Sequence, residues 1–347
     1  MVLWFLKGVS FNSITDNNMS REQSALVKGL AILLMLAYHF GRVLGSNGLS
    51  NEMAMFIGKT CHPIAFFMVV SGYGLYYAYR NNRLTYSYLL KRNLRLFISF
   101  WLVVLLFAVA LGFWLKPELF PRSPYLVLTN FLGWRWDYNQ YTWFLLPYVF
   151  VSLGSRVIFK CVDRLGNILS ILVTCAISLL MTWLISRYYM TFLRYNYWAY
   201  HPVLVLQTLS NFTFGAVMAR WFFAGHDLTW SKLKGKNLLV LALLVIVFVV
   251  KWLLPIPIVP YFAAVVILIL LHFSPTKLIQ HVFVPLGNKS MMMWFVHGYL
   301  AWKLFNDFYL MFKWPPLIWL VWVITSYLVA CLLMPVSDYI SKVLKLK

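Results

Sequence analysis

Residues Leu94–Leu115 read LRLFISFWLVVLLFAVALGFWL, a run of 22 residues in which Arg95 is the one charged side chain. An α-helix rises about 1.5 Å per residue, so this run is long enough to cross the roughly 30 Å hydrocarbon core of a bilayer. The whole chain has the same character, since 62% of its 347 residues are hydrophobic and 11% are charged. Soluble domains usually have about a quarter of their residues charged. The sequence therefore predicts an all-α, polytopic membrane protein.

Nine further apolar runs lie on either side of this one, and each is predicted to form a helix. Together they predict a bundle of about ten transmembrane helices, organised as a single domain over residues 1–347 with a short polar segment at about 1–24. The predicted helices span residues 25–44, 60–80, 94–115, 141–157, 168–186, 202–223, 237–253, 258–273, 289–312 and 316–336.

The 30 Lys and Arg residues give the chain a formal net charge of +21. They are scattered among the predicted loops rather than gathered on one face, which argues against nucleic acid as a partner. If the N-terminus is cytoplasmic, about two thirds of these residues fall on the cytoplasmic side, as the positive-inside rule requires. Both termini are therefore predicted to be cytoplasmic, and the basic loops are expected to contact membrane lipids.

Ionisable residues inside the apolar runs are candidates for a functional site, because placing them in a membrane is costly. The first predicted helix carries two, Lys28 and His39. Eleven residues at about 100° each come within about 20° of three whole turns, so the two side chains share one helix face about 16 Å apart. A purely structural explanation is equally open. Lys28 would then extend to the lipid headgroups, and His39 would hydrogen-bond a neighbouring helix.

Two further elements carry polar groups. Residues 66–74 read FFMVVSGYG, in which Ser71 and Tyr73 place hydroxyl groups beside small residues that allow close helix packing. Arg92 and Arg95 are three residues apart, so they share a face at the entry to the 94–115 helix. Two guanidinium groups at the cytoplasmic surface can bind a phosphate or pyrophosphate through paired hydrogen bonds. The alternative is that these arginines only set the topology.

Taken in order, these elements resemble the motifs of the acyltransferase-3 family of membrane acyltransferases. Lys28-Gly29-Leu30-Ala31 followed by His39 resembles the first helix of that family, and the FFMVVSGYG stretch resembles its second-helix element. The other matching segments are Arg92 and Arg95, which resemble an RxxR element, and Gly287–Ser290 with Trp294 and His297, which resemble a late helix.

One segment departs from the usual family pattern. Many members carry a WSLxxEEQFY element in the middle of the chain, and this sequence has no such acidic pair. Residues 141–146 instead read YTWFLL, which resembles the version found in the branch near polysaccharide acetylases and succinylases. The resemblance thus favours a protein that modifies an envelope glycan.

The resemblance implies transfer of an acyl group, most often acetyl, from cytoplasmic acyl-coenzyme A to a hydroxyl of a cell-surface polysaccharide or lipid-linked glycan. The location would be the bacterial plasma membrane. His39 would act as the general base or as a transient acyl carrier, since neutral imidazole is suited to both roles. The residues expected to bind or orient the acyl donor are Lys28, Ser71, Tyr73, Arg92 and Arg95.

Acetyl-coenzyme A is accordingly expected as a co-substrate, with acetyl and succinyl both open as the acyl group. A metal cofactor is not expected, because the four cysteines have no metal-ligand spacing.

The acceptor side is predicted to include two aromatic-rich segments, one around Arg135 and Asp137 and the other over residues 187–201. Trp143 and His297 are further candidates for this acceptor or supporting role. The alternative for these segments is an aromatic belt at the membrane surface. The rival function for the whole chain is a transporter or flippase for a glycan or lipid-linked sugar, which would favour paired internal repeats and interrupted helices.

Overall fold

The computed structural model describes residues 19–44, 62–226, 237–254, 259–273 and 275–346, and these residues contain helices and no β-strand. Residues 1–18 of the predicted polar segment lie outside the described residues. The longer helices are α2 (Arg21–Leu44), α4 (Pro63–Arg80), α5 (Tyr86–Val103), α8 (Leu145–Tyr188), α9 (Tyr197–Phe223), α10 (Asn237–Leu253), α11 (Val259–Leu270), α12 (Lys277–Gly298) and α14 (Pro315–Val343). The shorter elements are η2 (Val104–Gly112), α6 (Phe113–Leu115), α7 (Pro124–Phe131), η3 (Gln140–Thr142), η4 (Leu193–Tyr195), η6 (Tyr299–Leu304) and α13 (Asn306–Leu310).

Five helical stretches among the described residues are long and apolar enough to cross a membrane. They cover residues 21–41, 86–115, 140–188, 197–223 and 315–343. Large apolar side chains are exposed on α8, where Ile168 is 76% exposed and Leu172 is 58% exposed. Large apolar side chains exposed along a helix in this way favour contact with lipid over contact with water. The chain is therefore an integral membrane protein, whereas ten spans and cytoplasmic termini stay predictions.

The predicted and observed helix bounds differ most at α12, which begins at Lys277 rather than at residue 289. At α8 the sequence predicts two helices separated at residues 158–167, and the structure shows two helical parts that meet at a break at Gly166, inside this range. Gly166 has φ 78° and ψ 177°, a backbone conformation that side-chain-bearing residues rarely adopt. The helix that contains Arg92 and Arg95 also begins earlier than predicted. Thr85 caps it by accepting a hydrogen bond from the Tyr88 backbone N–H.

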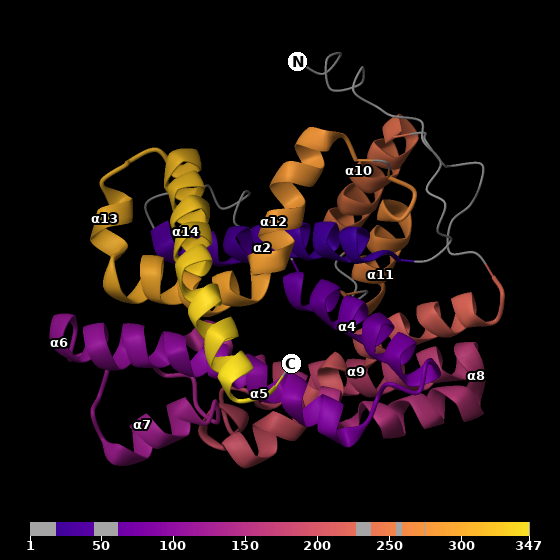
Figure 1. Cartoon of the computed structure of the whole chain (residues 1–347), viewed down its shortest axis with the longest axis horizontal. Coiled ribbons are helices and arrows are strands. Elements are labelled where there is room, and N and C mark those ends of the chain that lie inside the picture. Colours follow the sequence, from indigo (N-terminus) through magenta and orange to yellow (C-terminus); the bar gives the residue numbers. More distant parts are fainter. Residues whose placement is uncertain (1–18, 45–61, 227–236, 255–258, 274, 347) are drawn as a thin grey trace.

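Glycines allow α2 and α12 to pack in backbone contact. A Cβ atom on Gly29 would lie 2.2 Å from the Phe283 carbonyl oxygen, and one on Gly287 would lie 1.8 Å from the Ala25 carbonyl oxygen. Small residues at such crossings are typical of membrane helices, which gain packing energy from close approach. Figure 1 shows that α12 is bent, so that it crosses α2 and then runs beside it. Pro285 lies inside α12, where it removes one backbone hydrogen bond.

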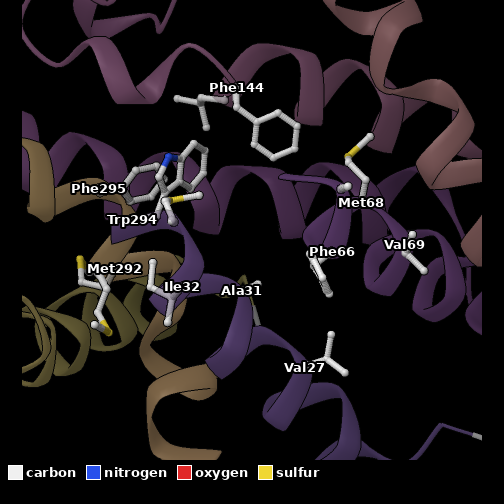
Figure 2. Close-up of a cluster of buried hydrophobic side chains, with 14 of the residues drawn as sticks. Val27, Ala31, Ile32, Phe66, Met68, Val69, Phe144, Met292, Trp294 and Phe295 are labelled. Atoms are coloured by element: carbon white, nitrogen blue, oxygen red, sulfur yellow. The ribbon is translucent and has the colours of Figure 1, made fainter. Parts of the chain in front are cut away.

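The buried core forms where α2, α4 and α12 meet. Figure 2 shows Val27 and Ala31 from α2 facing Phe66 from α4, with Trp294 and Phe295 from α12 close by. The side chains of Ala31, Phe66 and Phe295 have no solvent exposure. A second close crossing joins α4 to α9, because Cβ atoms on Gly72 and Gly215 would each meet a backbone oxygen at about 2 Å. These crossings bring the first helix against residues from the end of the chain.

Replacing Gly287 with Ala is expected to destabilise the protein, because the added methyl group would overlap the Ala25 carbonyl oxygen. Overpacking of this kind typically costs about 1–3 kcal/mol. The control is Gly74→Ala, since a Cβ there meets nothing within 4 Å. Thermal unfolding of the detergent-purified protein should show a lower Tm for Gly287→Ala alone. Equal Tm values for the two variants would contradict the close crossing.

Candidate functional site

Three aromatic rings from distant parts of the chain meet on the buried side of α2. His39 lies 3.9 Å from Tyr141 and 5.3 Å from His297, measured between ring centroids, and Tyr141 lies 5.0 Å from His297. His297 is fully buried, Tyr141 is 3% exposed and His39 is half-buried. We call these residues the three-ring group. They place two imidazoles and a phenol together in a membrane-embedded site.

Contacts between α12 and the short η3 helix hold Tyr141 in place. Asn139 donates from its side-chain amide to the Phe295 carbonyl oxygen at 2.9 Å and accepts from the Tyr141 backbone N–H at 3.2 Å. Trp294 donates from Nε1 to the Tyr141 carbonyl oxygen at 2.8 Å. Gly298 lets the two segments touch, because a Cβ there would lie 2.4 Å from both Asn139 and Tyr141. The ring of Tyr141 is therefore positioned by α12, the helix that also carries His297.

A second cluster surrounds Arg92. Its guanidinium donates to the hydroxyl groups of Ser71 and Ser152, each at 3.2 Å, and also to the hydroxyl of Tyr148. Ser71 and Tyr148 are hydrogen-bonded to each other at 3.0 Å. Lys28 is half-buried and lies within electrostatic reach of Arg92. We call these five residues the basic group.

The basic group holds two basic side chains with neutral neighbours. Within the described ranges the salt bridges lie elsewhere, between Arg135 and Asp137 and between Arg220 and Asp163. Two cations close together and partly removed from water repel each other unless an anion joins them. Arg92 has a planar fork of donors that suits a phosphate oxygen, and Lys28 adds a point charge. The arrangement is therefore suited to binding an anionic ligand.

The two other residues predicted to bind the acyl donor, Arg95 and Tyr73, are neighbours of Arg92 and Ser71 in the sequence but make different contacts. Arg95 lies one turn beyond Arg92 on α5, and its buried Nε has no hydrogen-bond partner among the described residues. Tyr73 is 5% exposed, and its hydroxyl accepts a hydrogen bond from the Met19 backbone N–H at 3.2 Å. Tyr73 thus contacts the segment that leads into α2, whereas Arg95 keeps an unused donor.

The two predicted acceptor-side segments pack together. Trp134 lies 4.5 Å from both Trp198 and His201, and Trp136 lies 4.9 Å from Tyr197. The members of this cluster, called the aromatic group below, are Trp134, Arg135, Trp136, Asp137, Tyr197, Trp198, Tyr200 and His201. Aromatic faces beside fixed polar groups form a surface that can contact a sugar.

A bidentate ion pair stabilises the aromatic group. Arg135 binds both oxygens of Asp137 at 2.8 Å and places its guanidinium 5.0 Å from the Tyr197 ring centroid. Burial disfavours the charged carboxylate of Asp137, but hydrogen bonds from Arg135 and Asn130 outweigh it and hold its pKa below the usual value. Trp143 is outside this cluster and packs edge-on against Phe144 at 5.9 Å.

The sequence alone did not predict that Tyr141, Tyr148 and Ser152 belong to these clusters. Tyr148 and Ser152 are four residues apart on α8, so they share the helix face that meets Arg92. That spacing was a usable signal, although many helices carry hydroxyl groups at this interval. No local signal pointed Tyr141 toward His39, because the contact depends on α12. In the described part of the chain, no three His, Cys, Asp or Glu side chains are grouped so that they could hold a metal ion.

Comparison with known proteins agrees with this arrangement of motifs. A family model described as an acyltransferase domain matches residues 24–335, which include all three clusters. The chain therefore belongs to the acyltransferase-3 family of membrane acyltransferases. Searches of curated proteins and of solved structures gave no match.

Proposed function

We propose that this membrane acyltransferase moves an acetyl or similar short acyl group from cytoplasmic acyl-coenzyme A to a hydroxyl of a cell-surface polysaccharide or lipid-linked glycan. The observation that carries the proposal is the pairing of two clusters along one face of α2. The basic group lies at Lys28, and the three-ring group lies at His39, about 16 Å further along the helix. One end suits an anion, and the other suits acyl-transfer chemistry.

The basic group supports coenzyme A as the donor. Coenzyme A carries a pyrophosphate and a further phosphate, and the described residues around Lys28 and Arg92 supply no carboxylate to balance their charge. Phosphate oxygens would supply that balance through charge-assisted hydrogen bonds, each of which contributes about 1.5–3 kcal/mol. The buried Nε of Arg95 offers a further donor one helical turn away.

The distance between the two clusters also fits such a donor. In coenzyme A a long pantetheine arm separates the phosphates from the thioester, so one molecule has to be held at two separate places. Lys28 is too far from His39 to touch the reacting atoms. The three-ring group would receive the thioester, with His39 as the general base or as a transient acyl carrier. The hydroxyl groups of Ser71 and Tyr73 would support the donor end of this path.

The aromatic group supports a sugar as the acceptor. Its tryptophan and tyrosine rings offer flat apolar faces, and the Arg135–Asp137 pair offers fixed polar atoms beside them. It connects to the three-ring group through one short segment, because Asp137 precedes Tyr141 by four residues. Trp143 and His297 would support the acceptor near the reacting atoms.

The rival function, transport without catalysis, makes different demands on the same residues. A transporter needs a substrate site but no imidazole that is altered during the reaction. The first experiment below tests the orientation of the chain, and the next two separate the two functions.

The segment from Asn81 to Lys91 should face the cytoplasm, because the densest cluster of basic residues lies around it. We expect Asn81→Cys, made in a variant that lacks the four native cysteines, to resist impermeant thiol reagents in intact cells. Ser123→Cys, which is exposed in a loop predicted to face outward, should react and serves as the control. Ready labelling at position 81 would reverse the orientation and separate Arg92 and Arg95 from a cytoplasmic donor.

His39→Ala should abolish acylation while leaving membrane insertion intact, because it removes an imidazole from the three-ring group. Loss of a general base typically lowers the rate by about a hundredfold or more. Glycan ester content, measured by NMR of the purified polymer, should fall to background in cells that carry this variant. Wild-type ester content in the mutant would exclude His39 from the chemistry.

Arg95→Lys should weaken acyl-coenzyme A binding by about tenfold or more, which corresponds to roughly 1.4 kcal/mol. The substitution keeps the charge and the topology signal but removes the planar fork of donors. Arg92→Lys should behave similarly, because lysine cannot reach Ser71, Ser152 and Tyr148 together.

The matched control for the arginine variants is Lys91→Gln, which removes an exposed positive charge from the same helix. Calorimetry or ligand-dependent thermal shift on purified protein measures the affinities. If the affinities of both arginine variants equal that of the wild type, or the wild type fails to bind coenzyme A, the arginines act in topology and the transporter is favoured.

A further inference from the structure

One nitrogen atom of the three-ring group has a fixed role. Nδ1 of His297 lies 2.7 Å from the Trp294 carbonyl oxygen and 3.3 Å from that of Met293. A carbonyl oxygen accepts hydrogen bonds and never donates them, so Nδ1 carries the ring hydrogen. In the neutral ring Nε2 then holds a lone pair and can only accept. The side chain of His297 is consequently set up as a hydrogen-bond and proton acceptor at Nε2.

Nε2 of His297 is buried and has no hydrogen-bond partner within the part of the chain that the structure describes. Buried polar atoms in native proteins usually have a partner, and an unpaired one is costly. The neighbouring His39 and Tyr141 rings stack on His297, each with an interplanar angle of 21°. Stacked rings present their faces, whereas a hydrogen bond to Nε2 arrives in the plane of the imidazole. Nε2 of His297 is therefore free to accept a hydrogen bond from a ligand.

The backbone around His297 is held in place, so the position of Nε2 is well defined. Trp322 on α14 donates from Nε1 to the His297 carbonyl oxygen at 3.0 Å. Gly298, the next residue, packs directly against Asn139 and Tyr141. The imidazole thus faces the other two rings because of contacts from three separate segments. A group positioned in this way can act on a substrate without first rearranging its own backbone.

We propose that the two imidazoles divide the reaction, with His39 carrying the acyl group and Nε2 of His297 taking the proton of the acceptor hydroxyl. This inference rests on the proposed function, because it assigns roles within acyl transfer to a glycan. An alcohol fits this assignment as the acceptor, since its O–H supplies a hydrogen that Nε2 can accept.

The two steps balance in atoms and charge. In the first, a ring nitrogen of His39 bonds to the acyl carbon, the C–S bond of the thioester breaks, and the His39 ring proton leaves with the coenzyme thiolate. In the second, the acceptor O–H bond breaks and its proton moves to Nε2 of His297. The acceptor oxygen then bonds to the acyl carbon and the acyl C–N bond breaks. His297 returns the proton to His39, and both rings are neutral again.

The burial of His297 has a chemical consequence. His39 is half-buried, whereas the side chain of His297 has no solvent exposure in this structure. Because His297 is fully buried, bulk water is kept away from Nε2. Exclusion of water protects a reactive acyl-imidazole from hydrolysis. The enclosed site therefore favours transfer to a glycan over wasteful hydrolysis of the donor.

The test uses His297→Asn and His297→Gln in the full-length protein. Asparagine can keep a donor near the position of Nδ1, and glutamine places an amide near that of Nε2, but neither side chain is a base. His272→Asn is the matched control, because His272 is also buried and its Nδ1 also lies 2.9 Å from a helix carbonyl oxygen. Thermal unfolding of each purified variant identifies those that fold as the wild type does.

Two readouts separate the two steps. The first is coenzyme A release in a single turnover of purified protein with radiolabelled acetyl-coenzyme A, and the second is glycan ester content in cells. Both His297 variants should keep coenzyme A release in the first turnover and lower the glycan ester content by about a hundredfold or more. His39→Ala should lose both, and His272→Asn should lose neither.

Each contrary result has a distinct meaning. If a folded His297 variant keeps its glycan ester content, or loses the first turnover together with the ester, the division of roles is wrong while the proposed function stands. If wild-type protein releases no coenzyme A from acetyl-coenzyme A, the proposed function itself fails.

Discussion

The rest of the structure depends on the direct backbone contact between α2 and α12. Gly29 and Gly287 leave no room for even a methyl group, since the nearest carbonyl oxygens would lie about 2 Å from it. In a membrane, apolar side chains gain little by leaving lipid, so close packing supplies most of the attraction between helices. The bend in α12 then carries its second half along α2. This single contact brings residues from the two ends of the chain into one site.

The same geometry separates two kinds of chemistry along α2. Lys28 joins a cluster of positive charge and hydroxyl groups, whereas His39 joins two buried rings. Charged groups in a membrane protein are retained where they do a task, because lipid offers them no solvation. The cationic cluster and the imidazoles of His39 and His297 thus lie at two separate positions along α2. The aromatic group connects to the three-ring group through the segment that precedes Tyr141.

The helical segments, the shared face of Lys28 and His39 and the family could be predicted from the sequence, because each depends on residues that are close together in the chain. Hydrophobic runs of about 20 residues identified the helices, because the bilayer thickness and the helix rise together determine their length. The spacing of Lys28 and His39 placed them on one face, since helical periodicity requires no knowledge of neighbours. The motif order also identified the acyltransferase-3 family, which the match over residues 24–335 confirmed. Helix bounds were predicted less accurately, as at the start of α12, because polar residues such as Asn288 and Lys289 can also lie inside a helix.

The sequence by itself thus determined the membrane class, the all-α fold and the family, and it supplied a set of polar candidates. Tertiary structure alone decided which of them meet. It placed His297 and Tyr141 against His39, gave Arg92 its partners Tyr148 and Ser152, and left Tyr73 bonded to Met19 instead. The physical reason is that a helical period fixes directions only within one helix. Contacts between helices depend on where small residues let two backbones cross, and on bends such as the one in α12.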